Sequence, residues 1–65
     1  MSDIEEAFKL KAQELLRLVA AKTLPPEKLQ EIRELFNEAK ATYEEGKAEE
    51  ALVLVVQAIK KYRGT

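Results

Sequence analysis

The chain has 65 residues, 46% of them hydrophobic, and its 11 basic and 12 acidic side chains give a formal net charge of -1. A chain of this length can bury one small core, so we expect one domain over residues 1–65. The near balance of charge does not favour binding to nucleic acid. The absence of cysteine and histidine excludes disulfide bonds, thiol nucleophiles and the usual nitrogen and sulfur ligands of zinc and haem.

The composition also predicts helices. Ala, Glu, Lys, Leu and Arg make up 40 of the 65 residues, a bias typical of long helices. The longest apolar run, from Ala51 to Val56, is far shorter than the roughly 20 residues that cross a bilayer. Met1 to Glu6 is acidic and has none of the features of an export signal. We therefore expect no membrane span, and a cytoplasmic location if the chain is produced in a cell.

The first helix is predicted over residues 3–23. Ser2-Asp3-Ile4-Glu5 matches a capping box, in which the serine hydroxyl and the glutamate carboxylate satisfy free amides at the start of a helix. One face of this segment is apolar, and Leu10 lies outside that face, near Glu14. The residues at the centre of the apolar face are Phe8, Ala12, Leu15, Leu16 and Val19.

The second helix is predicted over residues 26–45. Pro25 suits the position before the helix and Pro26 its first turn, where a missing N–H costs least. Leu24 and Leu29 have the spacing of a hydrophobic staple. The apolar face carries Leu29, Ile32, Leu35, Phe36, Ala39 and Tyr43. The opposite face carries Glu27, Glu31, Glu34, Glu38 and Glu45, which we interpret as a solvated surface and not as a docking site for a basic partner.

The third helix is predicted over residues 47–63. Gly46 is typical of a left-handed residue just past a helix end. Acidic residues follow it, and basic residues gather near position 63, the charge order that the helix dipole favours. Three helices of similar length joined by short connections predict an all-α, antiparallel up-down-up three-helix bundle. Loop length alone leaves the hand of the bundle open.

The third helix has more apolar residues than an internal core requires. Its core face is formed by Ala48, Leu52, Val55, Ile59 and Tyr62, and is widened by Ala51, Val56 and Ala58. Val53 and Leu54 fall outside this face. They mark either a wide core boundary or a contact surface for another protein or for a second copy of the chain. The candidate protein-binding residues are Val53, Leu54, Val56, Gln57 and Lys60, with Leu10 and Glu14 of the first helix as neighbours.

Other chemistry is sparse. Ser2 and three threonines are the only aliphatic hydroxyls, and no histidine can activate them, so we expect no catalytic residue and no enzyme. The pairs Glu44-Glu45 and Glu49-Glu50 flank the second turn, but their spacing matches no calcium loop. Without a glycine-rich phosphate loop either, we expect no metal, no cofactor and no small-molecule substrate.

The segment from Ala39 to Ile59, AKATYEEGKAEEALVLVVQAI, resembles the helical hairpin of tetratricopeptide repeats and that of microtubule-interacting-and-transport domains. The resemblance rests on small residues at Ala39, Ala51 and Ala58 and on the turn glycine Gly46. It implies a close approach of two helices. The second family also implies a three-helix bundle that binds helical tails of membrane-remodelling proteins.

The whole chain looks like a de novo designed miniprotein, because capping, staple, turn glycine and near-equal helices follow design rules uniformly. We therefore expect a non-catalytic designed bundle that presents a helical surface to a protein partner. The alternatives are a designed structural scaffold without a partner, and a natural adaptor of the microtubule-interacting type.

Overall fold

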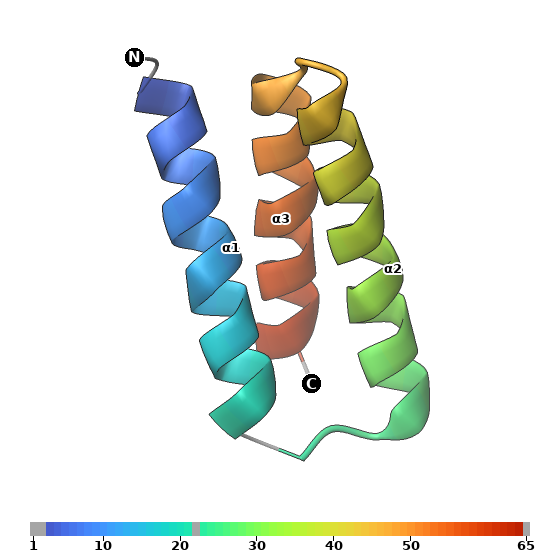
Figure 1. Cartoon of the computed structure of the whole chain (residues 1–65). Coiled ribbons are helices and arrows are strands. Elements are labelled where there is room, and N and C mark those ends of the chain that lie inside the picture. The colour runs from blue at the N-terminus through green and yellow to red at the C-terminus, as the bar shows by residue number, and fades with distance from the viewer. Residues whose placement is uncertain (1–2, 22, 65) are drawn as a thin grey trace.

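The computed structural model of the chain describes residues 3–21 and 23–64 and shows three helices (Figure 1). These are α1 (Asp3–Ala21), α2 (Pro26–Glu44) and α3 (Ala48–Arg63). Consecutive helices run antiparallel, and the described residues contain no strand. The predicted all-α, up-down-up three-helix bundle is confirmed.

The helix boundaries follow the breaker residues. Helix α1 begins at Asp3 as predicted, while the capping hydroxyl proposed for Ser2 lies outside the described residues. The predicted end of the first helix at residue 23 is wrong, since Thr23 is not helical. Helix α2 begins at Pro26, after an extended Pro25 whose carbonyl oxygen accepts a 3.0 Å hydrogen bond from the Leu29 N–H.

The turn between α2 and α3 is closed by a Schellman motif. Gly46 has φ +88°, and its N–H donates to the Tyr43 carbonyl over 3.0 Å. The Lys47 N–H donates to the Thr42 carbonyl over 3.2 Å, which completes the pair of bonds that defines this motif. Glu45 and Lys47 are therefore caps, and at this turn each helix stops one residue inside its predicted boundary.

Helix α3 is the centre of the bundle. It packs along both α2 and α1, whereas α1 and α2 contact one another least, and Figure 1 shows α3 lying behind the space between them. Ala39 of α2 and Ala51 and Ala58 of α3 are fully buried. Small side chains in a helix contact let two axes approach closely, as the resemblance to a helical hairpin implied.

Helix α1 joins this hairpin through two large buried side chains, Phe8 and Leu15. The Phe8 ring stacks on Tyr43 of α2, with ring centroids 4.4 Å apart and planes 8° from parallel. At the other end of the bundle, Leu24 of the connecting segment is buried in the core. Two contacts thus tie α1 and α2 together, one near each end.

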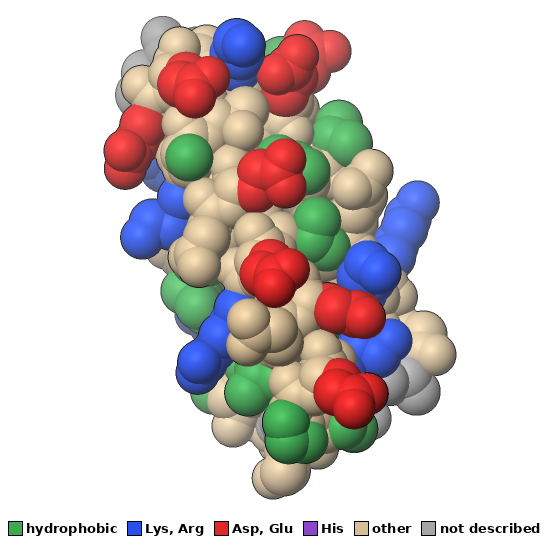
Figure 2. Space-filling model, turned by 90° about the vertical axis from the view of Figure 1, so that its right-hand side faces the viewer, with side chains coloured by type: hydrophobic (Ala, Val, Ile, Leu, Met, Phe, Trp, Pro, Cys, Tyr) green, Lys and Arg blue, Asp and Glu red, His purple; other side chains and the backbone are tan. Residues whose placement is uncertain are grey.

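The outward side of α2 is acidic. The five glutamates predicted to face water, Glu27, Glu31, Glu34, Glu38 and Glu45, are all exposed. Figure 2 shows acidic side chains spread along the length of this face. Among the described residues no polar or charged residue is buried as a whole, and none of the three helices has the length and apolar character needed to span a lipid bilayer.

We expect Ala39→Leu to lower the free energy of unfolding by about 1 to 3 kcal/mol, because the added atoms must push α2 away from α3. Ala41→Leu is the matched control: it makes the same change at an exposed position of α2 and should alter stability by no more than about 0.5 kcal/mol. Urea unfolding followed by circular dichroism measures both. Equal effects would contradict a tight contact between α2 and α3.

We expect Gly46→Ala to destabilise the protein by about 1 kcal/mol. A Cβ at this position would meet no atom within 4 Å, so the cost comes from the left-handed backbone alone. Gly46→Asn should cost clearly less, since asparagine tolerates this conformation. The same unfolding measurement tests the pair, and an asparagine variant as unstable as the alanine variant would rule out backbone strain as the cause.

Candidate protein-binding surfaces

The outer face of α3 is only partly as predicted. Val53 is 51% exposed, and Gln57 and Lys60 are exposed, whereas Leu54 and Val56 are half-buried. The helical pattern places Leu54 outside the core face, with a wide core boundary or a contact surface as the two alternatives; because it packs against the buried cluster, the structure favours the wide boundary for this residue.

Leu54 is drawn inward because the contact of α3 with α2 is wide. At about 100° per residue, Leu54 lies beside Ala51, Ala58 and Lys61. The first two are fully buried, and the Lys61 Nζ lies 3.7 Å from Glu31 Oε2 of α2. This side of α3 therefore faces α2.

The surface around Val53 is acidic. Val53 and Leu54 line a shallow hollow of about 340 Å³ between α2 and α3, together with Glu38, Thr42 and Glu50. A second hollow beside Val53 includes Glu49 and Lys47. Val53 is thus a half-exposed apolar residue whose neighbours in these hollows are mostly carboxylates, with Leu54 as the one other described apolar side chain.

The two predicted residues of α1 have different roles. Leu10 is 66% exposed and lines a hollow on the outer side of α1, with Arg17 and Leu18 among its neighbours. This hollow is separate from those that Val53 lines. Leu10 and Val53 therefore belong to two separate surfaces and do not form one site.

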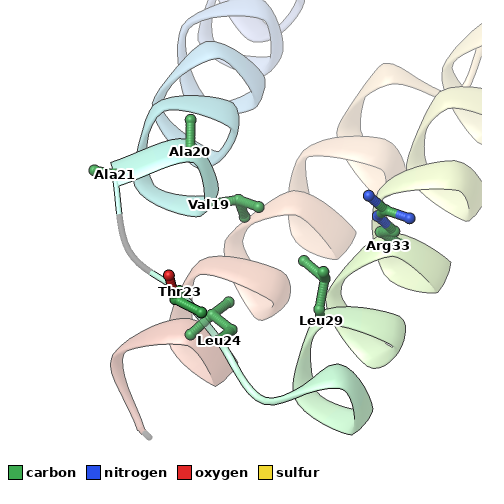
Figure 3. A pocket seen from close by; sticks show the side chains of 7 residues that line it. All are labelled: Val19, Ala20, Ala21, Thr23, Leu24, Leu29 and Arg33. Carbon is green, nitrogen blue, oxygen red and sulfur yellow. The ribbon is translucent and has the colours of Figure 1, made fainter.

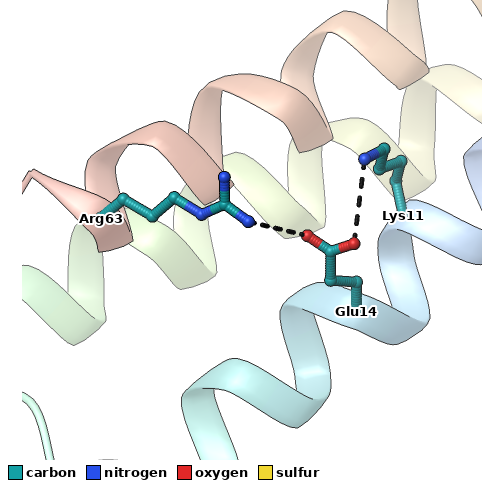
Figure 4. A network of polar contacts seen from close by, with 3 residues as sticks. All are labelled: Lys11, Glu14 and Arg63. Atoms are coloured by element: carbon teal, nitrogen blue, oxygen red, sulfur yellow. Dashed lines mark ion pairs between the residues drawn. The ribbon is translucent and has the colours of Figure 1, made fainter.

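Glu14 is part of an ion-pair network that joins α1 to the end of α3 (Figure 4). Its Oε1 lies 3.8 Å from Lys11 Nζ, and its Oε2 lies 3.6 Å from Arg63 Nη2. Although the side chain is 37% exposed, Oε2 itself is shielded from solvent and has no hydrogen-bond donor among the described residues. Arg63 is therefore the compensating charge, and Glu14 serves the packing of α1 on α3.

A different surface opens between α1 and α2. The pattern of α1 placed Leu16 at the centre of its apolar face, but Leu16 is 54% exposed, so that expectation is wrong. Leu16 lines a hollow of about 290 Å³ whose other members come from α1 and α2. Those members are Leu15, Val19, Ile32, Arg33, Phe36 and Asn37.

A second hollow of about 370 Å³ continues this one toward the connection between α1 and α2 (Figure 3). It shares Val19 and Arg33 with the first and adds Leu24 and Leu29. In Figure 3 the side chains of Val19 and Leu29 point toward one another from opposite walls. We call the two hollows together the α1–α2 groove.

The groove stays open because α2 presents polar side chains to α1. Arg33 and Asn37 line the groove, and their hydration would be lost if the helices closed on them. Lys40 follows on the same side of α2, with its Nζ 6.0 Å from the centroid of the Phe36 ring. The sequence contains a signal for this groove. Two cations, Arg33 and Lys40, alternate at helical spacing with Leu29 and Phe36, so they interrupt the apolar face of α2.

Comparison of the chain with protein-family models, with curated proteins and with solved structures gives no match. In the part of the chain that the structure describes, no group of three or more acidic side chains is placed to hold a metal ion. The site must therefore be interpreted from its own geometry.

We expect Val53→Glu to change the free energy of unfolding by no more than about 0.5 kcal/mol, because half of this side chain is already in water. Leu54→Glu should cost about 1 to 2 kcal/mol, because it places a carboxylate where a leucine packs on the core. Thermal and urea unfolding of the two neighbouring variants decide the matter. Equal stability of the two variants would show that the Leu54 side chain does not pack on the core.

Proposed function

We propose that the protein is a non-catalytic helical bundle that binds another protein through the α1–α2 groove. The observation that carries the proposal is the half-exposed Leu16, which stands over an apolar floor formed by Leu15 and Ile32. Apolar grooves between helices with polar side chains at their edges are a common way to receive a partner's side chains.

The residues that hold the groove open favour binding over a purely structural role. Apolar side chains at positions 33 and 37 would let α1 and α2 close and bury more apolar area. Arg33 and Asn37 instead leave the apolar groove accessible, at some cost in stability. A bundle made only to fold would gain from closing this surface.

The construction of the chain supports an origin by de novo design. Its helices of 19, 19 and 16 residues are joined by short connections, one started by Pro25-Pro26 and one closed by Gly46. Designers choose these devices because each fixes a helix end locally. A designed bundle with an open apolar groove suits a binding module.

The outer face of α3 is the competing surface, since Val53 is about as exposed as Leu16. The two differ in surroundings: Val53 shares its hollow with one apolar side chain, Leu54, and with carboxylates, while the hollow of Leu16 includes several apolar side chains, Val19 and Phe36 among them. Binding energy concentrates where several apolar side chains share one pocket. The groove is therefore the stronger candidate.

Selection from a phage library of helical peptides tests the proposal. We expect the peptides enriched on the immobilised protein to bind Val53→Glu as tightly as the original chain and to bind Leu16→Glu at least about tenfold more weakly, a loss typical of an interface hot spot. Because Leu16 is half in water, Leu16→Glu should keep its fold, which circular dichroism checks.

The opposite pattern, with binding lost in Val53→Glu and kept in Leu16→Glu, would move the site to α3. Failure to enrich any peptide over the Leu16→Glu chain would favour a scaffold without a partner.

A further inference from the structure

One charged side chain among the described residues lines the α1–α2 groove, and it is a cation; a second cation lies on the same side of α2, beyond the end of both hollows. Arg33 lines both hollows of the groove, and Lys40 lies seven residues further along α2, about 10 Å away along the helix. Neither cation forms an ion pair with another described residue. Both therefore have their charge available to a ligand.

Among the residues that the structure describes, no acidic side chain lines either hollow of the groove. This is unusual for a chain with 12 acidic residues and a net charge of -1. Four glutamates of α2 are on its outward side: Glu27, Glu31, Glu34 and Glu38. Glu44 lies one turn beyond Lys40, outside the lining of both hollows, and the glutamates of α3 gather in its first turn, beside Val53. The groove is thus a locally positive surface on a protein that is not positive overall.

The length and the lining of the groove limit what kind of ligand fits it. Its α2 wall runs from Leu29 to Asn37, about 12 Å or two turns of helix. The floor is apolar, whereas the α2 wall includes Arg33 and Asn37, so a ligand must bring apolar side chains repeated at the spacing of a helix face and polar groups beside them. An anion without an apolar face would leave Leu16 in water.

We infer that the occupant of the α1–α2 groove is an amphipathic α-helix of a partner protein, with its apolar stripe flanked by aspartate or glutamate residues. The apolar stripe covers Leu16, Val19 and Phe36. The flanking carboxylates lie toward Arg33 and Lys40, where opposite charges set orientation and speed association. This inference rests on the proposed function and adds the chemistry of the partner.

A second copy of the chain fits this groove less well. The most exposed apolar residue, Leu10, shares its hollow with the cation Arg17 and with Glu14, whose carboxylate already faces Lys11 and Arg63, so among the described residues this surface offers no unpaired acid to the cations of the groove. The outer face of α3 has the right charge but one exposed large apolar residue, Val53. A helix that fills two turns of groove needs about three such residues.

Two synthetic peptides test the inference directly. Both are fluorescein-labelled helices of about 16 residues with the same leucine stripe, one flanked by glutamates and the other by lysines. Fluorescence anisotropy at low ionic strength should show the glutamate peptide binding about tenfold more tightly than the lysine peptide. The preference should shrink in about 1 M salt, where charges are screened beyond roughly 3 Å.

Charge reversal supplies the decisive variant. Arg33→Glu combined with Lys40→Glu should invert the preference, so that the lysine peptide binds more tightly. The matched control, Arg17→Glu combined with Lys60→Glu, makes the same change in net charge at exposed positions on the outer sides of α1 and α3. The control should keep the preference for the glutamate peptide.

The outcomes separate this inference from the proposed function. Equal binding of both peptides, lost in Leu16→Glu, would retain the groove as a binding site and overturn the acidic partner. Binding of neither peptide would overturn the helical occupant, while the library selection still decides whether the groove binds protein. A dimer in sedimentation that dissociates in Leu16→Glu would replace the partner helix with a second copy of the chain.

Discussion

The arrangement of the bundle depends on the close contact between α2 and α3. The buried side chains in this contact include three alanines, Ala39 of α2 and Ala51 and Ala58 of α3. Because these side chains are small, the two helices can pack closely, and the short turn at Gly46 can join them. Helix α1 cannot share in this contact. It packs instead on the remaining apolar side of α3, through Phe8 and Leu15. The molecule therefore has two closed helix contacts and one open one.

The open contact is held at both ends. The stack of Phe8 on Tyr43 fixes α1 to α2 at one end, and the buried Leu24 fixes the connection at the other. Between these points the polar Arg33 and Asn37 occupy positions where apolar residues would have closed the bundle. The geometry that exposes Leu16 is thus set by contacts on either side, and the partner that we propose would meet a surface that already has its shape.

Much of the fold could be predicted because its signals are local. Pro26 starts α2 and Gly46 ends it, whatever the rest of the chain does. The candidate site could not be predicted in the same way. A helical pattern gives the angular position of Leu16 or Leu54, but burial depends on where the neighbouring helices lie. Because α2 and α3 approach so closely, Leu54 at the edge of its face is covered, while Leu16 near the centre of its face is not.

The unequal contacts among the three helices have a consequence for local unfolding. The hairpin of α2 and α3 has the more extensive contact and the shorter connection, whereas α1 rests on α3 with little support from α2. Helix α1 is therefore the segment that detaches at the lowest free energy, and its amides exchange with solvent first. A molecule that contacts both walls of the groove would hold α1 against the hairpin of α2 and α3. Occupancy would then register as slowed amide exchange along α1, even at residues that the bound molecule never touches.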